Sequence, residues 1–283
     1  MELERTAARH WRGTEEQWLG GWLLRAAEGF TGRANSALPL GDPPGSLDDA
    51  LDAVTRWYRA RGLPSMISVP MPLGGALALD TELARRGWGV RPGPAFVMTA
   101  TSTGRAAETE PETAPPGAEL RIDAAMDAEW LRLQEQGRPP RARYDGGSGH
   151  RARIGGMGVR GCPPGKHCGS TPKGSSPRVV EQVLTSAPEQ AFISFRGGDT
   201  AVAVARLSLA GGWAGIASVE VDPAHRRRGL GAAITGACRA EAFARGVNRV
   251  FLQVETGNDA ARALYERCGF TYSHWYHYRV APD

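Results

Sequence analysis

The sequence lacks a long hydrophobic run. Nowhere in its 283 residues do apolar positions continue for the roughly 20 residues that a membrane-spanning helix needs, so we expect no membrane partner. The first residues, MELERTAARHWRG, are charged and contain no apolar stretch of the secretory type. Cysteine is scarce, with four residues, too few for a disulfide framework in a chain of this length. We therefore expect a reducing, cytoplasmic location.

Standard metal-binding spacings are missing as well. Cys162, His167 and Cys168 in CPPGKHC are possible zinc ligands, with His150 as a distant fourth. Their spacing matches no standard zinc finger. We expect no metal site.

Acidic residues are almost absent from one segment. Between residues 137 and 178 the chain has nine Lys and Arg, eleven Gly and a single acid, Asp145. This leaves 25 basic and 29 acidic residues elsewhere, so most of the chain is mildly acidic and the pI of 9.1 comes largely from this segment. The distribution makes nucleic acid an unlikely partner for the protein as a whole. Without apolar periodicity, residues 137–178 are expected to form a disordered basic insertion or a long loop, and their composition leaves a coding irregularity open as an alternative.

The first hundred residues predict a mixed α/β unit. Strand-like runs at 22–30 and 33–40 precede a helix at 46–62, with a Ser46 cap and apolar residues at helical spacing. A strand at 66–69, a helix at 79–88 and a strand at 94–100 follow. Residues 101–117, rich in Pro, Thr, Glu and Gly, are typical of a linker. The expected domains are 1–100 and 118–283.

The second unit predicts a sheet with helices around it. A strand at 118–125 and a helix at 126–136 precede the basic segment, and a short helix at 179–187 follows it. Three strands at 190–197, 200–212 and 213–223 come next. Polar residues alternate with apolar ones at 202–208, which indicates a partly solvent-facing antiparallel meander. The chain ends with a helix at 229–246, a strand at 249–256, a helix at 259–270 and a strand at 272–280.

The most informative motif is VEVDPAHRRRGLGAAI, residues 219–234. A strand ends at Asp222-Pro223, three arginines follow, and Gly229 and Gly231 allow a close backbone approach at the start of a helix. Free N–H groups and the helix dipole make such a corner an anion site of the pyrophosphate kind. The alternative is a solvated basic corner. The motif is neither a P-loop nor a GxGxxG dinucleotide fingerprint.

Three pieces of the second unit resemble one family. RRRGLG is similar to the Q/R-x-x-G-x-G/A signature of the GNAT superfamily, the acyl-CoA-dependent N-acyltransferases. VEVDPAH resembles that family's fourth strand, and NDAARALYERCGF resembles its closing segment. The pieces stand in the family's order over about the last hundred residues. The resemblance implies the GNAT fold, a mixed and mostly antiparallel sheet flanked by helices.

The resemblance also implies a site for acetyl-CoA as co-substrate. The backbone of Val219, Glu220 and Val221 would pair with the pantetheine arm, and Asn258 would face the cofactor from the end of the fifth strand. Tyr265 matches the tyrosine that protonates the departing thiolate in many relatives, although it could also be a core residue. The diphosphate would be wrapped by the turn formed by Arg226, Arg227, Arg228, Gly229, Leu230 and Gly231.

The chemistry of amine attack on a thioester adds two requirements. A backbone N–H, for which Val221 is the candidate, has to stabilise the charge on the carbonyl oxygen. A base has to take the proton of the amine, and Glu255 and Glu220 are the candidates; the alternative for each is a solvated strand residue. Gln253 occupies the position at which some relatives carry a glutamate base.

The first unit resembles the closing half of a GNAT module but contains no RxxGxG turn. The chain thus resembles the tandem GNAT proteins of actinobacteria, in which one half is degenerate. Arg33, Asn35 and Ser36 could face the acceptor or could satisfy backbone groups in a turn. The final strand, with Tyr272, Trp275, Tyr276 and His277, is expected to be buried near the acceptor pocket.

The sequence therefore predicts an acetyl-CoA-dependent N-acetyltransferase. The acceptor would be a small-molecule or peptide amine, and the protein a monomer or homodimer. The basic segment leaves a second hypothesis open, a non-catalytic acyl-CoA-binding or nucleic-acid-associated regulatory protein with the same fold.

Overall fold

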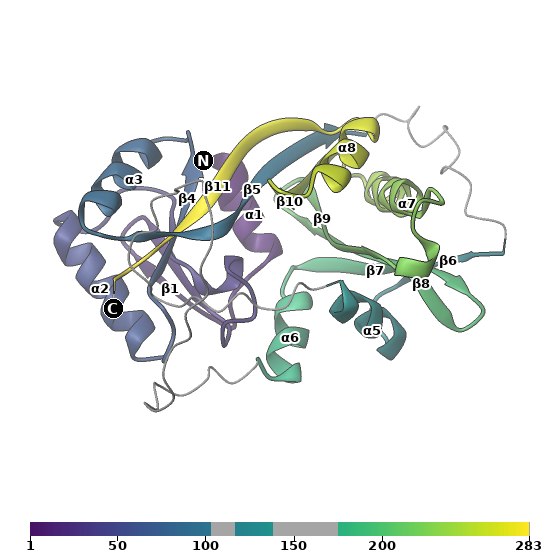
Figure 1. Ribbon diagram of the computed structural model, residues 1–283, viewed down its shortest axis with the longest axis horizontal. Coiled ribbons are helices and arrows are strands. Elements are labelled where there is room, and N and C mark those ends of the chain that lie inside the picture. The colour runs from purple at the N-terminus through teal and green to yellow at the C-terminus, as the bar shows by residue number, and fades with distance from the viewer. Residues whose placement is uncertain (103–116, 138–174, 283) are drawn as a thin grey trace, which may run out of the picture.

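A computed structural model describes residues 1–102, 117–137 and 175–282. The fold is mixed α/β with a mostly antiparallel sheet, as predicted, and it has two halves that lie side by side (Figure 1). The first half contains α1 (Glu2–His10), β1 (Glu15–Leu19), β2 (Trp22–Ala26), a 3-10 turn (Arg33–Asn35), β3 (Leu38–Pro39), α2 (Leu47–Arg59), β4 (Met66–Met71), α3 (Ala76–Arg85) and β5 (Gly89–Thr101).

The second half supplies the other strands and helices. They are β6 (Glu119–Asp123), α5 (Ala128–Gln136), α6 (Pro177–Leu184), β7 (Glu189–Gly197), β8 (Thr200–Ala210), β9 (Trp213–Val221), a 3-10 turn (Pro223–His225), α7 (Leu230–Ala244), β10 (Arg249–Glu255), α8 (Asp259–Arg267) and β11 (Thr271–Val280). Helix α6 begins two residues before the predicted helix, because Ser176 caps it. No helix of the described residues is long and apolar enough to cross a membrane.

Local side-chain hydrogen bonds explain where α2 begins and why the strand predicted at 33–40 is shorter than expected. Helix α2 begins after Ser46 because the Ser46 hydroxyl accepts the N–H of Asp49 at 3.1 Å. The strand predicted at 33–40 is confirmed only at Leu38–Pro39 (β3), since Arg33–Asn35 form a 3-10 turn. The Asn35 side chain accepts the N–H groups of Ala27 and Gly29, both at 2.8 Å, and so bends the chain at this point.

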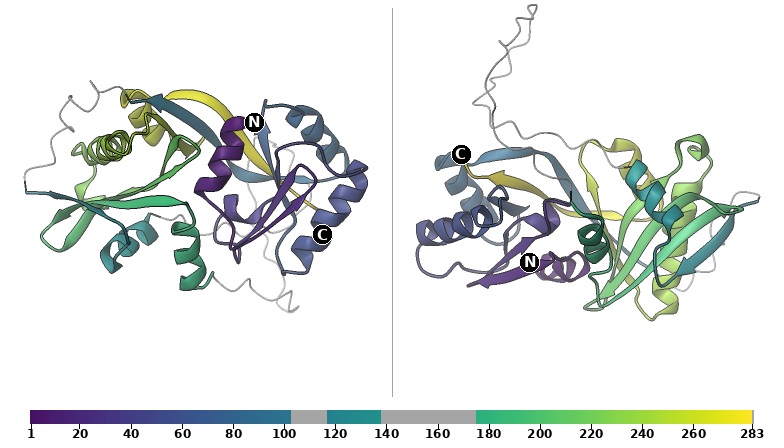
Figure 2. Two further views of the ribbon diagram at one scale, coloured as in Figure 1. Left: turned by 180° about the vertical axis from the view of Figure 1, so that it is seen from behind. Right: turned by 90° about the horizontal axis from the view of Figure 1, so that it is seen from below.

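Eight strands form one sheet that runs through both halves. Their order is β4-β11-β5-β10-β9-β8-β7-β6, and a separate three-stranded sheet contains β1, β2 and β3. Strand β5 of the first half lies between β10 and β11, and β11 of the second half lies between β4 and β5 (Figures 1 and 2). Each half therefore receives the last strand of the other. The expected linker overlaps residues 103–116, which lie outside the described residues, and the domain boundaries stay predictions.

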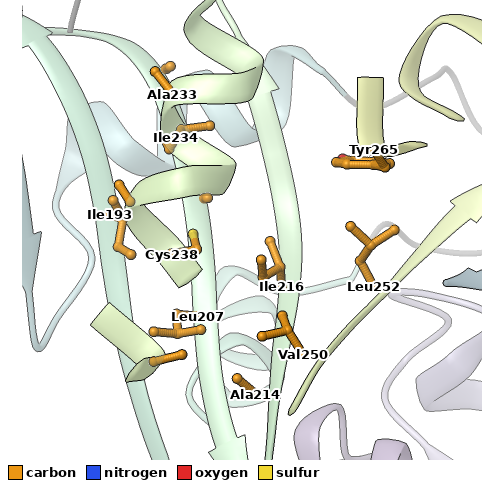
Figure 3. Close-up of a cluster of buried hydrophobic side chains, with 14 of the residues drawn as sticks. Ile193, Leu207, Ala214, Ile216, Ala233, Ile234, Cys238, Val250, Leu252 and Tyr265 are labelled. Carbon is orange, nitrogen blue, oxygen red and sulfur yellow. The ribbon is translucent and has the colours of Figure 1, made fainter. Parts of the chain in front are cut away.

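The sheet of the second half is covered on both faces. Helices α7 and α8 pack on one face, where Ile216, Ile234 and Leu252 belong to a buried apolar cluster (Figure 3). Helices α5 and α6 pack on the other face through a second buried cluster. This cluster also contains Trp11, which directly follows α1. Burial of these two apolar layers is the main stabilisation of this half.

The predicted antiparallel meander is confirmed as β7, β8 and β9, but the prediction that it partly faces solvent is wrong. Strand β8 is buried almost throughout, and Arg206 and Ser208 are 0% and 1% exposed. The face that carries them is covered by α6 and by α1, because Arg206 donates to the carbonyl oxygens of Leu184 and His10. The alternation of polar residues in this strand therefore marks a buried polar layer and not solvent.

Candidate functional site

The candidate site begins where two parallel strands separate. Strands β9 and β10 pair over four residues only, from Trp213 opposite Arg249 to Ile216 opposite Leu252. Beyond this point β9 pairs with β8 alone, and its register shifts at a bulge where Ser218 has φ 52°. A bulge re-aims a strand. The segment 219–221 thus has an edge that β10 does not cover, at the position that the sequence analysis assigned to the pantetheine arm.

The turn after β9 is built by its own side chains. Asp222 accepts the N–H of Ala224 at 2.9 Å and starts the 3-10 turn, and Arg226 Nε donates to the carbonyl oxygen of Val221 at 3.2 Å. Arg227 and Gly229 have positive φ values of 63° and 80°. Glycine is the residue that adopts this conformation without strain.

The N-terminus of α7 is open. Gly229 is its N-cap, no side chain caps the helix, and its first turn contains no acid. Among the described residues a Cβ at Gly229 would meet no atom within 4 Å, whereas a Cβ at Gly231 would lie 3.0 Å from Leu264 of α8. The two predicted glycines thus differ, since Gly229 borders open space and Gly231 lets two helices approach. The exposed Arg226, Arg227, Arg228 and Gly229 and the buried Leu230 complete this turn.

Glu220 lies near the end of β9. Its carboxyl group packs against Gly137, the residue that follows the last turn of α5. Burial raises the pKa of Glu220 to about 7, and the nearby Arg226 opposes this shift. A carboxylate with this pKa exchanges protons near neutral pH. Sequence reasoning proposed Glu220 as a base without being able to see this burial.

Tyr265 projects from α8 into the core of the second half (Figure 3). Its ring packs edge-on against Phe270, with 6.0 Å between the ring centroids, and the residue is 7% exposed. Burial raises the pKa of the Tyr265 phenol, and the charge of Glu220 raises it further. The phenol therefore keeps its proton at neutral pH. The structure brings Tyr265 and Glu220, which are 45 positions apart, into electrostatic contact.

The other two predicted side chains occupy the far end of β10. Asn258 caps α8, since its side-chain oxygen accepts the N–H of Ala261 at 3.1 Å. Glu255 is exposed, and its carboxyl group lies 3.8 Å from the position of a Cβ on Gly93 in β5. Of the two candidate bases, only Glu220 perturbs the Tyr265 phenol.

Sequence reasoning missed a polar layer on the opposite face of the sheet. Arg33 Nη1 and the Tyr276 hydroxyl both donate to Gln253 Oε1, at 2.6 and 3.3 Å. Arg33 thus reaches the second half from the first. Asn35 and Ser36 have structural roles, because Asn35 holds its own turn and Ser36 accepts from Arg25.

The signal for this layer was present in the sequence. Polar residues interrupt the apolar strand β8, and Arg33 stands in a polar run between two apolar ones. The possible zinc ligands Cys162, His167, Cys168 and His150 lie outside the described residues, as do residues 138–174 of the basic segment 137–178. The prediction of disorder is wrong at the end of this segment, where Pro177 and Arg178 belong to α6.

Two family models match the chain. The family described as "Probable histone acetyltransferase Rv0428c C-terminal" matches residues 1–153, and the acetyltransferase (GNAT) family matches residues 167–270. The uncharacterized N-acetyltransferase YobR of Bacillus subtilis (strain 168) is 27% identical over 281 residues, which is 99% of this chain and 97% of that protein.

Solved structures share the fold. A GCN5-related N-acetyltransferase from Kribbella flavida superposes with a TM-score of 0.62 at 16% identity, over 96% of this chain and 90% of that one. A tandem GNAT protein from the clavulanic acid biosynthesis pathway gives 0.57 at 12% identity, over 87% and 74%. The chain belongs to the GNAT superfamily of N-acetyltransferases, with an N-terminal part of the Rv0428c C-terminal type and a GNAT acetyltransferase domain in its second half.

Proposed function

We propose that this acetyltransferase binds acetyl-CoA in its second half and moves the acetyl group to a primary amine by direct attack. The observation that carries the proposal is the combination of an uncovered edge on β9 with the open N-terminus of α7 directly after it. The pantetheine arm would pair with the backbone of Val219, Glu220 and Val221 as a neighbouring strand does.

The turn between β9 and α7 fits a diphosphate. The N–H groups of Gly229, Leu230 and Gly231 precede the first hydrogen bonds of α7, in which Ala232 and Ala233 donate to the Gly229 carbonyl oxygen. The helix dipole and Arg226, Arg227 and Arg228 add positive charge. These groups would hold the phosphates and fix the thioester end beside β9.

Glu220 is the proposed general base. With a pKa raised to about 7, it is partly ionised at neutral pH and is basic enough to take a proton from the incoming amine. The Val221 N–H is the proposed donor to the carbonyl oxygen of the thioester, where negative charge develops during attack. Glu255 is exposed at the end of β10, which makes it the weaker of the two predicted bases.

Tyr265 is the proposed general acid. Its phenol keeps its proton at neutral pH, and the charge of Glu220 contributes to the raised pKa of this phenol. Within the described residues its hydroxyl has no hydrogen-bond partner, so it is free to donate to a thiolate. The proton would pass from the phenol to the sulfur as the carbon–sulfur bond breaks, and the CoA thiol leaves.

The test joins binding with turnover. Calorimetry with acetyl-CoA and a panel of primary amines assayed for release of the CoA thiol should give binding and amine-dependent release. Protein that neither binds acetyl-CoA nor releases CoA contradicts the proposal. Binding without release from any amine leaves the alternative of a non-catalytic acyl-CoA-binding protein.

A further inference from the structure

A small polar pocket lies between the two halves, on the face of the sheet opposite α7 and α8. It has a volume of about 30 Å³, and its wall contains residues of α1, the 3-10 turn of the first half, β8, β9, β10 and β11. This is about the room that two water molecules or the two oxygens of a carboxylate occupy. Three arginines face it, Arg25, Arg33 and Arg206.

Arg206 is the deepest of the three and is 0% exposed. Its Nε and Nη1 donate to the carbonyl oxygens of Leu184 and His10, while its Nη2 has no hydrogen-bond partner among the described residues. Burial and, to a smaller extent, the charge of Arg33 together lower its pKa to about 9, so the guanidinium is still charged at neutral pH. A buried charge without an anion is costly, and a buried donor without an acceptor adds to that cost.

Arg33 stands next to Arg206 at the half-buried side of the pocket. Its guanidinium lies 4.3 Å from the centroid of the Trp11 ring, and that of Arg206 lies 5.4 Å from the same ring. Both guanidinium groups thus lie against the Trp11 ring, and the charge of Arg33 disfavours the charged form of Arg206. An anion close to both groups would offset this repulsion.

The pocket carries more positive than negative charge, since its described lining contains three arginines and one acid, Glu4. Within the described residues none of its three arginines forms an ion pair, and the Arg25 guanidinium donates only to Ser36. The acid in the wall, Glu4, is engaged by His274 Nε2 at 2.7 Å. The pocket is thus positively charged, of carboxylate size, and has an unpaired donor at its base.

We propose that this pocket binds a carboxylate of the acceptor, so that the substrates are amines that carry a carboxylate; the inference rests on the proposed acetyl transfer. Arg206 lies opposite Ala217 on β9, and Glu220 follows three residues later, with a bulge between them. With the rise per residue of a β-strand, the positions of Arg206 and Glu220 are about 7 to 10 Å apart along the sheet. The amine and the carboxylate are therefore several bonds apart, as in a lysine side chain or a dipeptide, and not neighbours as in an α-amine.

Matched acceptors test this directly. The value of kcat/KM for 6-aminohexanoate should exceed that for hexylamine and 6-aminohexanamide by about 10- to 100-fold, the scale of a charge-assisted pair. Glycine should be a poor acceptor, because its amine and carboxylate are too close together. Comparison of kcat/KM for lysine and for a glycine dipeptide shows which of these two natural amines fits better. Equal values for 6-aminohexanoate and hexylamine overturn the proposal.

Variants locate the effect. Arg33→Gln should reduce the preference for 6-aminohexanoate over hexylamine to below about threefold, because one of the two facing charges is lost. Arg61→Gln is the matched control: Arg61 also lies over a tryptophan ring, 3.7 Å from Trp57, but is outside the pocket, so the preference stays. A full preference in Arg33→Gln contradicts the proposal.

The proposed function and the pocket can fail separately. If no amine is acetylated, the transfer proposal fails, and the pocket is judged by calorimetry in the presence of CoA. In that case 6-aminohexanoate should still bind wild-type protein at least tenfold more tightly than hexylamine, and Arg33→Gln should lose this difference. Equal binding of the two compounds to wild-type protein overturns the pocket.

Discussion

In both halves a strand leads through a glycine-containing turn into a helix, β3 into α2 and β9 into α7. The two helix N-termini differ. That of α2 is capped by Ser46, and Asp48 and Asp49 occupy its first turn. That of α7 has neither a side-chain cap nor an acid, and arginines precede it. Carboxylates and a side-chain cap satisfy and neutralise the N-terminus of α2, which therefore does not attract an external anion. The N-terminus of α7 lacks both and can attract one.

The strands and helices that follow show the same contrast. Seven residues after its N-cap, α8 carries the buried Tyr265, while α3 carries Glu82, which pairs with Arg86. The cleft of the first half, about 420 Å³, has a wall of mostly apolar residues with Asp42 and Glu82 as its acids. The chain thus contains the strand–turn–helix arrangement twice. The copy at α7 has an uncapped helix N-terminus next to arginines, and the copy at α2 has a capped N-terminus with acids. At the two helix N-termini the difference concerns charge and capping.

The largest effect is expected from a bulky residue at the open turn. Gly229→Trp places an indole where the diphosphate is proposed to lie, and turnover with acetyl-CoA should fall more than 10²-fold. Gly45→Trp is the control in the first half, because Gly45 also has a positive φ, 69° against 80° for Gly229. Both variants carry about 1–2 kcal/mol of backbone strain, so thermal unfolding should shift equally. A comparable loss of turnover in Gly45→Trp would remove the distinction between the halves.

Removal of one hydroxyl comes next. Tyr265→Phe keeps the ring against Phe270, so the affinity for acetyl-CoA should stay within about twofold while kcat falls roughly 10²-fold. Stopped-flow or steady-state release of the CoA thiol measures the change. A rate within twofold of wild type, with chemistry shown to be rate-limiting, would make Tyr265 a core residue.

The carboxylate at the end of β9 should produce a pH dependence. Burial raises the pKa of Glu220 from 4.5 to about 7, so the basic form is lost below that pH and kcat/KM should rise between pH 6 and pH 8. Glu220→Gln should lower kcat/KM about 10- to 10²-fold and flatten this rise. Glu255→Gln, at an exposed position, is the control that should keep the pH profile. A profile that persists in Glu220→Gln assigns the base elsewhere.

The smallest effect is expected from the exposed arginines. The double change of Arg227→Gln and Arg228→Gln should weaken acetyl-CoA binding a few-fold, since solvent and salt screen exposed charges. The loss should shrink as the salt concentration is raised, which titrations at several ionic strengths measure. A loss that does not depend on salt would indicate a change in the turn itself.

Much of this site could be predicted because its signals are local. The Asp222-Pro223 end of a strand, the two glycines and the helix start are consecutive in sequence, and the structure places them in one turn. The buried pocket was not predictable in the same way. Arg33 and Gln253 are 220 positions apart and meet only because β5 and β11 exchange between the halves.

Burial also changed the order of the two proposed bases. The sequence pattern favoured Glu255 over Glu220, whereas the structure packs Glu220 against Gly137 and leaves Glu255 exposed. The solvent-facing reading of β8 was wrong for the same reason, because nothing in residues 202–208 shows that α1, some 200 positions earlier, covers that face. Long-range packing, which sequence periodicity does not contain, therefore decides the burial of Glu220 and of the polar pocket.

The stoichiometry of acetyl-CoA binding tests the central claim most directly. Isothermal titration of the full chain should give one acetyl-CoA per chain for wild-type protein, with no measurable heat for Gly229→Trp, because α7 is open and α2 is closed by Ser46, Asp48 and Asp49. Two sites per chain, or one site that survives in Gly229→Trp, would contradict the account.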